Sequence, residues 1–352
     1  MKTELFQIQD VNKDRAALQK AAKILKAGGL VVMPTETVYG LGGDATNKEA
    51  AKAIYEAKGR PSDNPLIIHI ANPEDAERYA ETSDTYYRLA RHFMPGPLTV
   101  ILPKKDSIPL SVTGGLDTVA VRCPSHPVAR ALIEETGVAI AAPSANRSGR
   151  PSPTCAAHAI EDLWGRVDMI LDGGDCEVGL ESTIVKLEGE NGILLRPGAI
   201  TPDDLRAVIP ELTIAPAVTA ALAEGERVLS PGMKYRHYAP AAPLTLLEGD
   251  TDDVRAFLLQ KAEEPSIGIL CFDEEIPLMP SQARLFPVGP GTDLGTQAHR
   301  LFAALREADA DPDVTELYAH LPPREGLGLA LYNRAIRAAA HHILHVNKPR
   351  KG

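Results

Sequence analysis

The sequence predicts an α/β protein with two domains. The chain has 352 residues, of which 44% are hydrophobic and 24% charged, enough to build two hydrophobic cores. Helix and strand patterns alternate over the first two hundred residues and again from residue 244. Between them, residues 210–243 contain five prolines, which regular sheets and long helices tolerate poorly. We therefore expect a first domain over residues 1–209, a linker over 210–243 and a second domain over 244–352.

Apolar periodicity places the elements of the first domain. Residues 14–27 carry four apolar side chains on one helical face, namely Leu18, Ala21, Ala22 and Leu25. Asn47 is suited to cap a helix over 48–57, and Pro73 and Pro202 each stand at a first helical position. The expected strands are residues 30–33, 66–70, 98–102, 118–122, 138–142, 169–171, 183–187 and 193–195.

The second domain repeats this alternation. We expect strands at 244–247, 267–272 and 314–318, and helices at 252–263, 294–308 and 327–342. The segment before it, SPGMKYRHYAP (230–240), differs from the Gly- and Ser-rich composition of flexible linkers. Its aromatic and cationic residues, Tyr235 to Tyr238, indicate that the linker docks on a surface.

Composition excludes several classes of protein. Lys and Arg total 37 against 47 Asp and Glu, a net charge of −10 that argues against a broad cationic surface for nucleic acid. No run of 18 uninterrupted apolar residues predicts a transmembrane helix, and the first residues lack an apolar signal core, so we expect a cytoplasmic protein. The four cysteines, at 123, 155, 176 and 271, lack the spacing of a metal site, so we expect reduced, mostly buried thiols.

Common catalytic and nucleotide-binding motifs are missing. The chain has no P-loop, no GxGxxG after a strand, no GxSxG and no HExxH. Polar segments instead follow predicted strands, where open α/β sheets bind ligands. The first is Pro34–Gly42, which is also compatible with an ordinary loop between a strand and a helix.

Two further segments offer groups that bind anions. Lys58-Gly59-Arg60 places two cations on a constrained turn, although cations also suit the C-terminal end of a helix. Residues 141–152 run from an apolar strand into a loop with three serines, an asparagine and two arginines, which suits phosphate oxygens or simple solvation. His69, on a predicted strand, is by itself most simply a core histidine.

Taken together, these segments resemble one family, the threonylcarbamoyl-AMP synthases with a YrdC-like domain. The family hallmark is KxR followed later by SxN, which Lys58-Gly59-Arg60 and Ser144-Ala145-Asn146 match. PTETVYGLG, NPLIIHI, MPGPLT, RCP, APSAN and ESTIV are similar to family segments in the same order, over about residues 1–205. SPGMKYRHYAP and GLGLALYNRAIRAA (326–339) resemble the two-domain form of the family.

The resemblance implies a fold and an activity. The fold would be a twisted mixed α/β sheet with a large concave cavity, followed by a smaller Rossmann-like domain. The enzyme would be a nucleotidyltransferase that joins L-threonine, bicarbonate or CO2, and ATP into threonylcarbamoyl-adenylate and pyrophosphate. A downstream tRNA threonylcarbamoyl transferase would use the product to make threonylcarbamoyladenosine in tRNA.

It also implies the site residues. Lys58 and Arg60 would be catalytic, the threonine-binding residues would be Thr37, His69, Arg122, Ala142 and Ser182, and the ATP-binding residues would be Lys58, Arg60, Asn64, Thr118, Ser144, Ser152, Arg196 and Tyr235. Tyr235 would close over the nucleotide as a lid that excludes water. Mg²⁺ would be held mainly by the triphosphate rather than by protein side chains, with no organic cofactor.

Two rival functions are weighed against this one. An enzyme that forms carbamoyl-adenylate from carbamoyl phosphate would need zinc-binding or acylphosphatase-like parts, for which this chain lacks the cysteine spacing and the length. A non-catalytic RNA-binding module would need a basic surface, which the net charge disfavours. A weak contact with tRNA and the role of the second domain stay open. His341, His342 and His345 have the i, i+4 spacing of a metal pair, but a structural role on a terminal helix is favoured.

Overall fold

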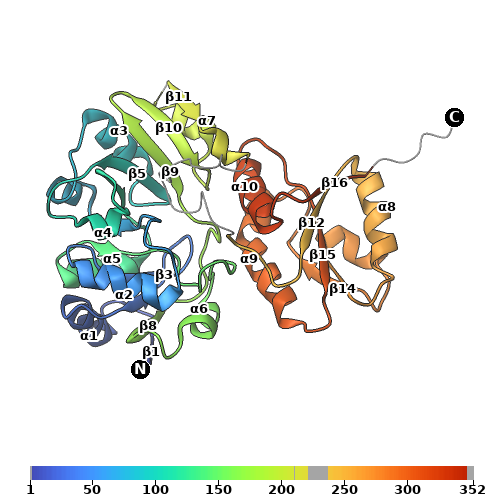
Figure 1. Ribbon diagram of the computed structural model, residues 1–352, viewed down its shortest axis with the longest axis horizontal. Coiled ribbons are helices and arrows are strands. Elements are labelled where there is room, and N and C mark those ends of the chain that lie inside the picture. The colour runs from blue at the N-terminus through green and yellow to red at the C-terminus, as the bar shows by residue number, and fades with distance from the viewer. Residues whose placement is uncertain (1, 210, 221–236, 347–352) are drawn as a thin grey trace. The chain divides into compact units, whose positions relative to one another are not determined.

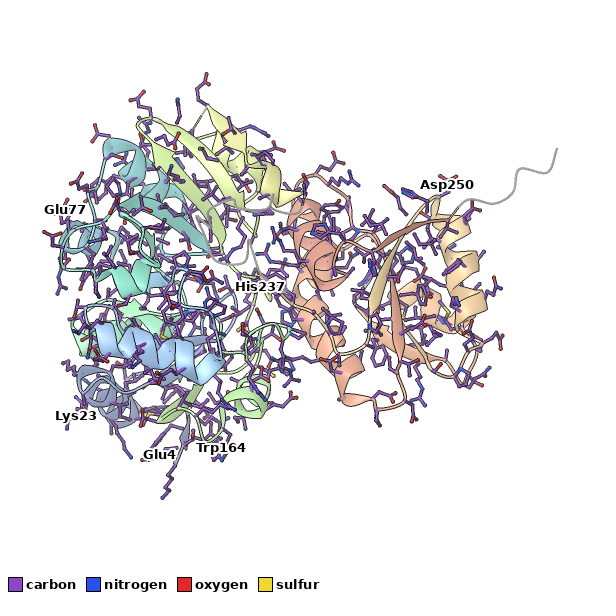
Figure 2. All side chains as sticks on the ribbon, in the orientation of Figure 1. Glu4, Lys23, Glu77, Trp164, His237 and Asp250 are labelled. Carbon is purple, nitrogen blue, oxygen red and sulfur yellow. The ribbon has the colours of Figure 1, made fainter. Side chains whose placement is uncertain are left out.

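The computed structural model describes residues 2–209, 211–220 and 237–346. The chain divides into two compact units, the first Met1–Ser148 with Ser152–Lys234 and the second Gly149–Pro151 with Tyr235–Gly352 (Figure 1). Charged side chains such as Lys23, Glu77 and Asp250 project outward from the ribbon (Figure 2). No helix among the described residues is long and apolar enough to cross a membrane. The domain boundaries expected at residues 209 and 243 stay a prediction.

The first unit is built on a mixed sheet. In the part of the chain that the structure describes, the strand order is β1-β8-β2-β3-β7-β4-β6-β5-β9-β10-β11. These strands are β1 Glu4–Gln7, β2 Val31–Met33, β3 Gly40–Asp44, β4 Ile67–His69, β5 Leu98–Pro103, β6 Thr118–Arg122, β7 Ile140–Ala141, β8 Met169–Asp172, β9 Thr183–Glu188, β10 Asn191–Arg196 and β11 Leu212–Ile214. Parallel pairs such as β4 with β6 alternate with antiparallel pairs such as β5 with β6, so the predicted mixed α/β sheet is confirmed.

Helices pack on this sheet and also stand beside its edges. They are α1 Arg15–Lys26, α2 Lys48–Lys58, α3 Asp84–Phe93, α4 Leu110–Thr113, α5 Pro127–Thr136, α6 Ala156–Leu163 and α7 Pro202–Arg206, with 3₁₀ helices η1 Pro73–Arg78 and η2 Pro216–Val218. The predicted face of α1 is buried, because Leu18, Ala21, Ala22 and Leu25 join one core cluster with α5 side chains such as Leu132. The predicted cap of α2 is also confirmed, since the Asn47 side chain accepts a hydrogen bond from the Glu49 amide.

The strand β3 is an element that the sequence patterns did not predict. Its sequence, GLGGD, lies partly inside the segment that was expected to be a loop. Glycine is required here by close packing, because a Cβ on Gly42 would stand 2.8 Å from Cγ2 of Ile140 and 3.1 Å from the Val31 carbonyl oxygen. Strand β11 and helix η2 also lie within the segment expected to be a linker without regular structure.

The second unit contains a parallel sheet with the order β14-β13-β15-β12-β16 among the described residues. Its strands are β12 Leu244–Glu248, β13 Ile267–Cys271, β14 Arg284–Pro287, β15 Glu316–His320 and β16 Ile343–His345, and its helices are α8 Thr251–Lys261, η3 Asp273–Leu278, α9 Leu294–Ala310 and α10 Gly328–Ala338. All printed pairings are parallel, so a second α/β fold is confirmed. The expected terminal helix was too long, since α10 ends at Ala338 and the histidines at 341, 342 and 345 follow it.

Candidate active site

The two halves of the KxR and SxN pattern meet in the folded chain. Lys58 is the last residue of α2, which ends at Gly59 in the left-handed conformation with φ of 63°. The Lys58 side chain is 3% exposed, and its Nζ donates hydrogen bonds to the carbonyl oxygens of Ser144 and Asn146. It also donates to Oδ1 of Asn146 at 3.4 Å, and the Ser144 hydroxyl donates to the same oxygen at 2.5 Å. Lys58 therefore braces the loop that follows β7.

The turn after α2 is held by Arg60. Its Nη2 donates to the carbonyl oxygens of Pro65 at 3.2 Å and Asn64 at 3.4 Å. The Tyr55 hydroxyl donates to the same Asn64 carbonyl at 3.1 Å. The Asn64 side chain is only 1% exposed, and its Oδ1 has no hydrogen-bond partner among the described residues. A buried acceptor without a partner costs free energy, which is typical of a ligand site.

Three neighbouring strands place polar side chains on one face of the sheet. His69 at the end of β4 stands opposite Arg122 at the end of β6, and Thr99 of β5 stands opposite Arg122 on its other side. Directly opposed residues point to the same face, so these three side chains lie together. Thr118 begins β6 and shares that face, about 13 Å from Arg122 along the strand.

Arg122 forms a buried ion pair. Its Nη2 lies 2.7 Å from Oε1 of Glu36, and both side chains are 5% exposed. The Ser125 amide donates to the other carboxylate oxygen of Glu36 at 3.2 Å. The Nε of Arg122 is buried without a hydrogen-bond partner among the described residues. The guanidinium is thus neutralised on one side and has an unused donor on the other.

His69 is neutral in the folded protein. It is 3% exposed, and burial together with the charge of Arg122 lowers its pKa to about 3. Its Nδ1 is buried without a hydrogen-bond partner in the described part of the chain. The interpretation of His69 as a satisfied core histidine is therefore not supported, since a polar atom of the ring stays unsatisfied.

Ser182 and Arg196 extend the same cluster. Arg196 donates from Nε to the Ser182 carbonyl at 3.0 Å and from Nη2 to the Ser182 hydroxyl at 3.1 Å. That hydroxyl is also 2.7 Å from the hydroxyl of Thr99, so Ser182 is tied to the strand face that carries Arg122. Next to it in the chain, Glu181 accepts a hydrogen bond from the hydroxyl of Ser152.

Thr37 and Ala142 belong to the loops beside this face. The Thr37 side chain is fully buried, and its hydroxyl is 2.9 Å from that of Thr35. The amide of Ala142 donates to the carbonyl of Ile67 in β4 at 2.9 Å. The loop that carries Thr37 is joined to the SxN loop, because the Ala145 amide donates to the Tyr39 carbonyl at 2.7 Å.

The structure thus brings most predicted site residues into linked groups. Thr118 lies at the far end of its strand from Arg122, and Tyr235 lies outside the described residues. The predictions omitted Glu36, Thr99 and Glu181, which contact Arg122, Ser182 and Ser152 respectively. The sequence did contain a signal for the two acids, because each stands in a polar segment that was already singled out. No group of three or more His, Cys, Asp or Glu side chains in the described residues could hold a metal ion.

Comparisons with known proteins show which family the chain is similar to. A family model described as telomere recombination matches residues 23–198, and a model of the threonylcarbamoyl-AMP synthase C-terminal domain matches residues 200–340. A threonylcarbamoyl-AMP synthase of Pyrococcus abyssi is 43% identical over 335 residues, 93% of this chain and 95% of that protein. One of Bacillus subtilis is 43% identical over 331 residues, 93% of this chain and 94% of that protein.

The fold has a solved counterpart of the same length. The crystal structure of P. abyssi Sua5 complexed with L-threonine superposes with a TM-score of 0.89 at 41% identity, covering 99% of this chain and all of that chain. The fold and these relatives thus define an α/β enzyme of the transferase type. The chain belongs to the threonylcarbamoyl-AMP synthase family. The family and enzyme class predicted from the sequence are confirmed.

Proposed function

We propose that this chain condenses L-threonine, bicarbonate or CO2, and ATP into threonylcarbamoyl-AMP and pyrophosphate. The observation that carries the proposal is a set of buried polar atoms without partners among the described residues, Asn64 Oδ1, His69 Nδ1 and Arg122 Nε. All three belong to residues for which the family resemblance implies substrate binding. Burying such atoms costs about 1–3 kcal/mol each unless a ligand satisfies them.

The threonine subsite would lie at the ends of β4 and β6. Arg122 Nε would donate to the threonine carboxylate, for which a guanidinium is a matched partner. Neutral His69 would exchange a single hydrogen bond with the amino acid without adding charge. Thr37, Ser182 and the backbone of Ala142 would complete this subsite, since they border the same strand face.

The ATP subsite would be formed by the KxR turn and the SxN loop. Lys58 and Arg60, the proposed catalytic cations, would stabilise phosphate oxygens, with Asn64, Ser144, Ser152, Arg196 and Thr118 contacting the nucleotide. In the ligand-free structure, Lys58 and Ser152 already donate to protein oxygens. These bonds must be exchanged for bonds to phosphate, because phosphate oxygens only accept hydrogen bonds.

The reaction needs positioning more than a protein nucleophile. The threonine amine becomes a carbamate, whose oxygen attacks the α-phosphorus while pyrophosphate leaves with the electron pair of the broken P–O bond. Buried cations stabilise the charge that develops on the phosphate oxygens. Mg²⁺ would be held by the triphosphate oxygens, since the described residues form no carboxylate cage.

The finer features of the prediction belong to this proposal as well. The strand face would line a concave cavity, the second unit would be Rossmann-like, and the linker with Tyr235 would dock as a lid over the nucleotide. The protein would act in the cytoplasm and supply a tRNA threonylcarbamoyl transferase. No organic cofactor is required by this chemistry.

The test measures pyrophosphate release from ATP with L-threonine and bicarbonate. We expect Arg60→Ala and Lys58→Ala to abolish release while circular dichroism shows a folded protein. Lys52→Ala is the matched control, because Lys52 is an exposed lysine of the same helix. Normal turnover in either folded variant would contradict the assignment. Turnover with carbamoyl phosphate in place of threonine and bicarbonate would instead support the carbamoyl-adenylate alternative.

A further inference from the structure

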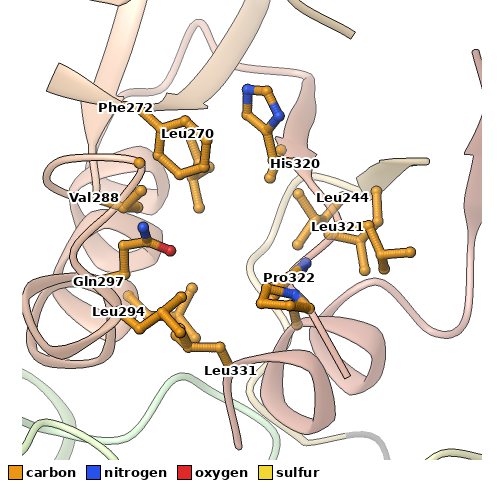
Figure 3. Close-up of a pocket in the computed structure, with 16 residues that line it drawn as sticks. Leu244, Leu270, Phe272, Val288, Leu294, Gln297, His320, Leu321, Pro322 and Leu331 are labelled. Atoms are coloured by element: carbon orange, nitrogen blue, oxygen red, sulfur yellow. The ribbon is translucent and has the colours of Figure 1, made fainter. Parts of the chain in front are cut away.

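The second unit contains a pocket that the reaction does not use. A cavity of about 120 Å³ that opens to solvent lies between the sheet and helices α9 and α10 (Figure 3). Leu246, Leu270 and Ala319 form the sheet wall, and Leu301 and Leu331 form the helix wall. Pockets that bind small molecules are mostly apolar, as this one is. The opposite face of the sheet packs on α8 and forms a separate core.

The topology of the sheet places a crevice at the carboxyl ends of β13 and β15. Strand β13 continues to β14 on one side, whereas the chain after β15 passes β12 and continues to β16 on the other side. The two strands are neighbours, with Leu270 opposite Ala319. Where connections diverge from adjacent parallel strands, a crevice forms at the carboxyl ends of the strands, and ligands bind there. Phe272 and His320 stand at these two strand ends and line the pocket.

One polar atom is directed into the pocket. Gln297 is 6% exposed, and its amide nitrogen donates to the Pro290 carbonyl at 2.8 Å. That bond fixes the side chain so that Oε1 points toward the space between the walls (Figure 3). No hydrogen bond to this oxygen is formed within the described residues. The pocket therefore presents an acceptor that a ligand in the pocket can reach.

The charges around the mouth exclude an anionic ligand. None of the residues that line the pocket is Lys or Arg. The loop before α9 contains Gly289 and Gly291, but carboxylates of the protein already accept hydrogen bonds from an amide of this loop and from one in the first turn of α9. Glu274 accepts from the Gly291 amide at 3.0 Å, and Asp293 accepts from the Thr296 amide at 3.0 Å. A phosphate at this helix N-terminus would meet two negative charges instead of donors.

The aromatic groups favour a flat ligand. The rings of Phe272 and His320 stack with centroids 4.4 Å apart and an interplanar angle of 20°. His320 Nε2 lies 2.8 Å from Oε1 of the fully buried Glu275. Burial would raise the pKa of Glu275, but the His320 contact, the Phe272 amide and Arg255 lower it below its usual value. The stack is therefore fixed in place and can serve as a platform for another ring.

We propose that this pocket binds an uncharged, flat heterocycle with an N–H donor for Gln297 Oε1 and a ring system of the size of a purine base, whose substituents reach solvent through the open side. The inference does not depend on the synthase reaction. Its failure would leave that function untouched.

The experiment records methyl NMR spectra of the full chain labelled at leucine, with adenosine as the probe. Adenosine should shift the methyl signals of Leu270, Leu301 and Leu331 in a saturable way. Because the signals are resolved by site, binding at the catalytic unit is seen separately, for example at Leu66. No shift at these three leucines up to the solubility limit of adenosine would overturn the proposal.

Two comparisons identify the donor contact. Purine riboside, which lacks the exocyclic amine of adenosine, should bind about tenfold more weakly, which is about the value of one hydrogen bond. Gln297→Leu should weaken the binding of adenosine by a similar factor, so that adenosine and purine riboside bind with equal affinity. Gln260→Leu, on the exposed side of α8, is the matched control and should change nothing. Equal affinities for the two nucleosides in the unmodified chain would refute the contact without any substitution.

A third comparison tests the exclusion of anions. Adenosine 5′-monophosphate should bind in this pocket more weakly than adenosine. Glu274→Gln keeps an oxygen for the Gly291 amide but removes one charge, so it should reduce that difference. Tighter binding of the monophosphate than of adenosine would contradict the proposed class of ligand.

Discussion

The ion pair between Arg122 and Glu36 allows a quantitative test of the site. Glu36→Gln keeps the size of the side chain but removes the negative charge, and it leaves one oxygen to accept from either Arg122 or Ser125, where the carboxylate has two. Since both side chains are 5% exposed, Arg122 would be left as an uncompensated buried cation. Removing one partner of a buried pair costs about 3–5 kcal/mol. Because a hydrogen bond is retained, we expect the lower end, about 3 kcal/mol in the free energy of unfolding.

The chain offers a matched control for this change. Arg15 and Glu135 form an ion pair of similar length, 2.8 Å, with side chains 67% and 24% exposed. Glu135→Gln makes the same chemical change where water screens the charges, so the loss should be below about 1 kcal/mol. Urea unfolding of both variants at pH 7 measures the difference. Equal losses would refute the reasoning that burial decides the strength of the pair.

L-Threonine extends the test to the proposed subsite. Its carboxylate would replace the missing charge beside Arg122, so threonine should stabilise Glu36→Gln more than the unmodified chain. Saturation at a hundred times the dissociation constant stabilises a protein by about 2.7 kcal/mol, which is within the range of the measurement. L-Threoninol lacks the carboxylate and should not reduce the difference in the free energy of unfolding between Glu36→Gln and the unmodified chain. If both compounds stabilise Glu36→Gln equally, the threonine carboxylate does not bind beside Arg122.

Three further outcomes follow from the structure. His69 has a pKa of about 3 in the folded chain and about 6.5 in the unfolded chain. Between these pH values only the unfolded chain binds the proton. The free energy of unfolding therefore decreases as the pH falls below 6.5, by up to about 1.4 kcal/mol per pH unit. In urea unfolding, the free energy of unfolding of His69→Gln should therefore decrease between pH 7 and pH 5 by about 2 kcal/mol less than that of the unmodified chain. An equal decrease in both proteins would contradict this prediction. His92→Gln is the control, because His92 is exposed. Three of the four cysteines are buried, and burial raises the pKa of Cys123 and Cys271 to about 12, so a thiol reagent should label only Cys155 quickly in the native protein and all four after unfolding. Rapid labelling of more than one thiol would contradict that burial. Glu181→Gln should lower KM for ATP in the pyrophosphate assay. The change removes a buried negative charge beside the proposed phosphate subsite and weakens the hydrogen bond that Ser152 donates to this side chain. An unchanged or higher KM would indicate that Glu181 does not lie near the phosphates.

Local patterns predicted the elements that have a clear period and clear ends. The helix α1 has a strict apolar face and a glycine stop, and its four predicted core residues are buried. The strand β3 was missed because its glycines carry no side-chain pattern, and their reason lies in the close approach of Ile140, almost a hundred residues away. The short strand β16 was also missed, because it pairs with β12 over only three residues, too few for a sequence pattern to show.

The sequence selected residues that the fold brings into linked groups, but it did not predict the contacts among them. Spacing cannot show that Lys58 meets the loop of Ser144 and Asn146, because β7 carries that loop back to the end of α2 only in the folded sheet. Glu36 was passed over for a similar reason. An acid between two threonines in a loop carries no sign of its partner 86 residues further on. Motifs identify residue types, whereas strand register decides which of them meet.

The contacts of the two proposed subsites differ in a way that bears on the order of binding. On the ATP side, Lys58, Ser144 and Ser152 already donate to protein oxygens, so a triphosphate must break those bonds before it gains its own. On the threonine side, His69 Nδ1 and Arg122 Nε are buried without partners among the described residues, so an amino acid gains bonds there without breaking any. A ligand that satisfies unpaired buried groups meets a preformed site, whereas one that exchanges bonds requires rearrangement. Asn64 Oδ1 on the ATP side is also unpaired, but as an acceptor it cannot bond to phosphate oxygens. We therefore expect the phosphate part of the ATP subsite to rearrange more on binding than the contacts of His69 and Arg122.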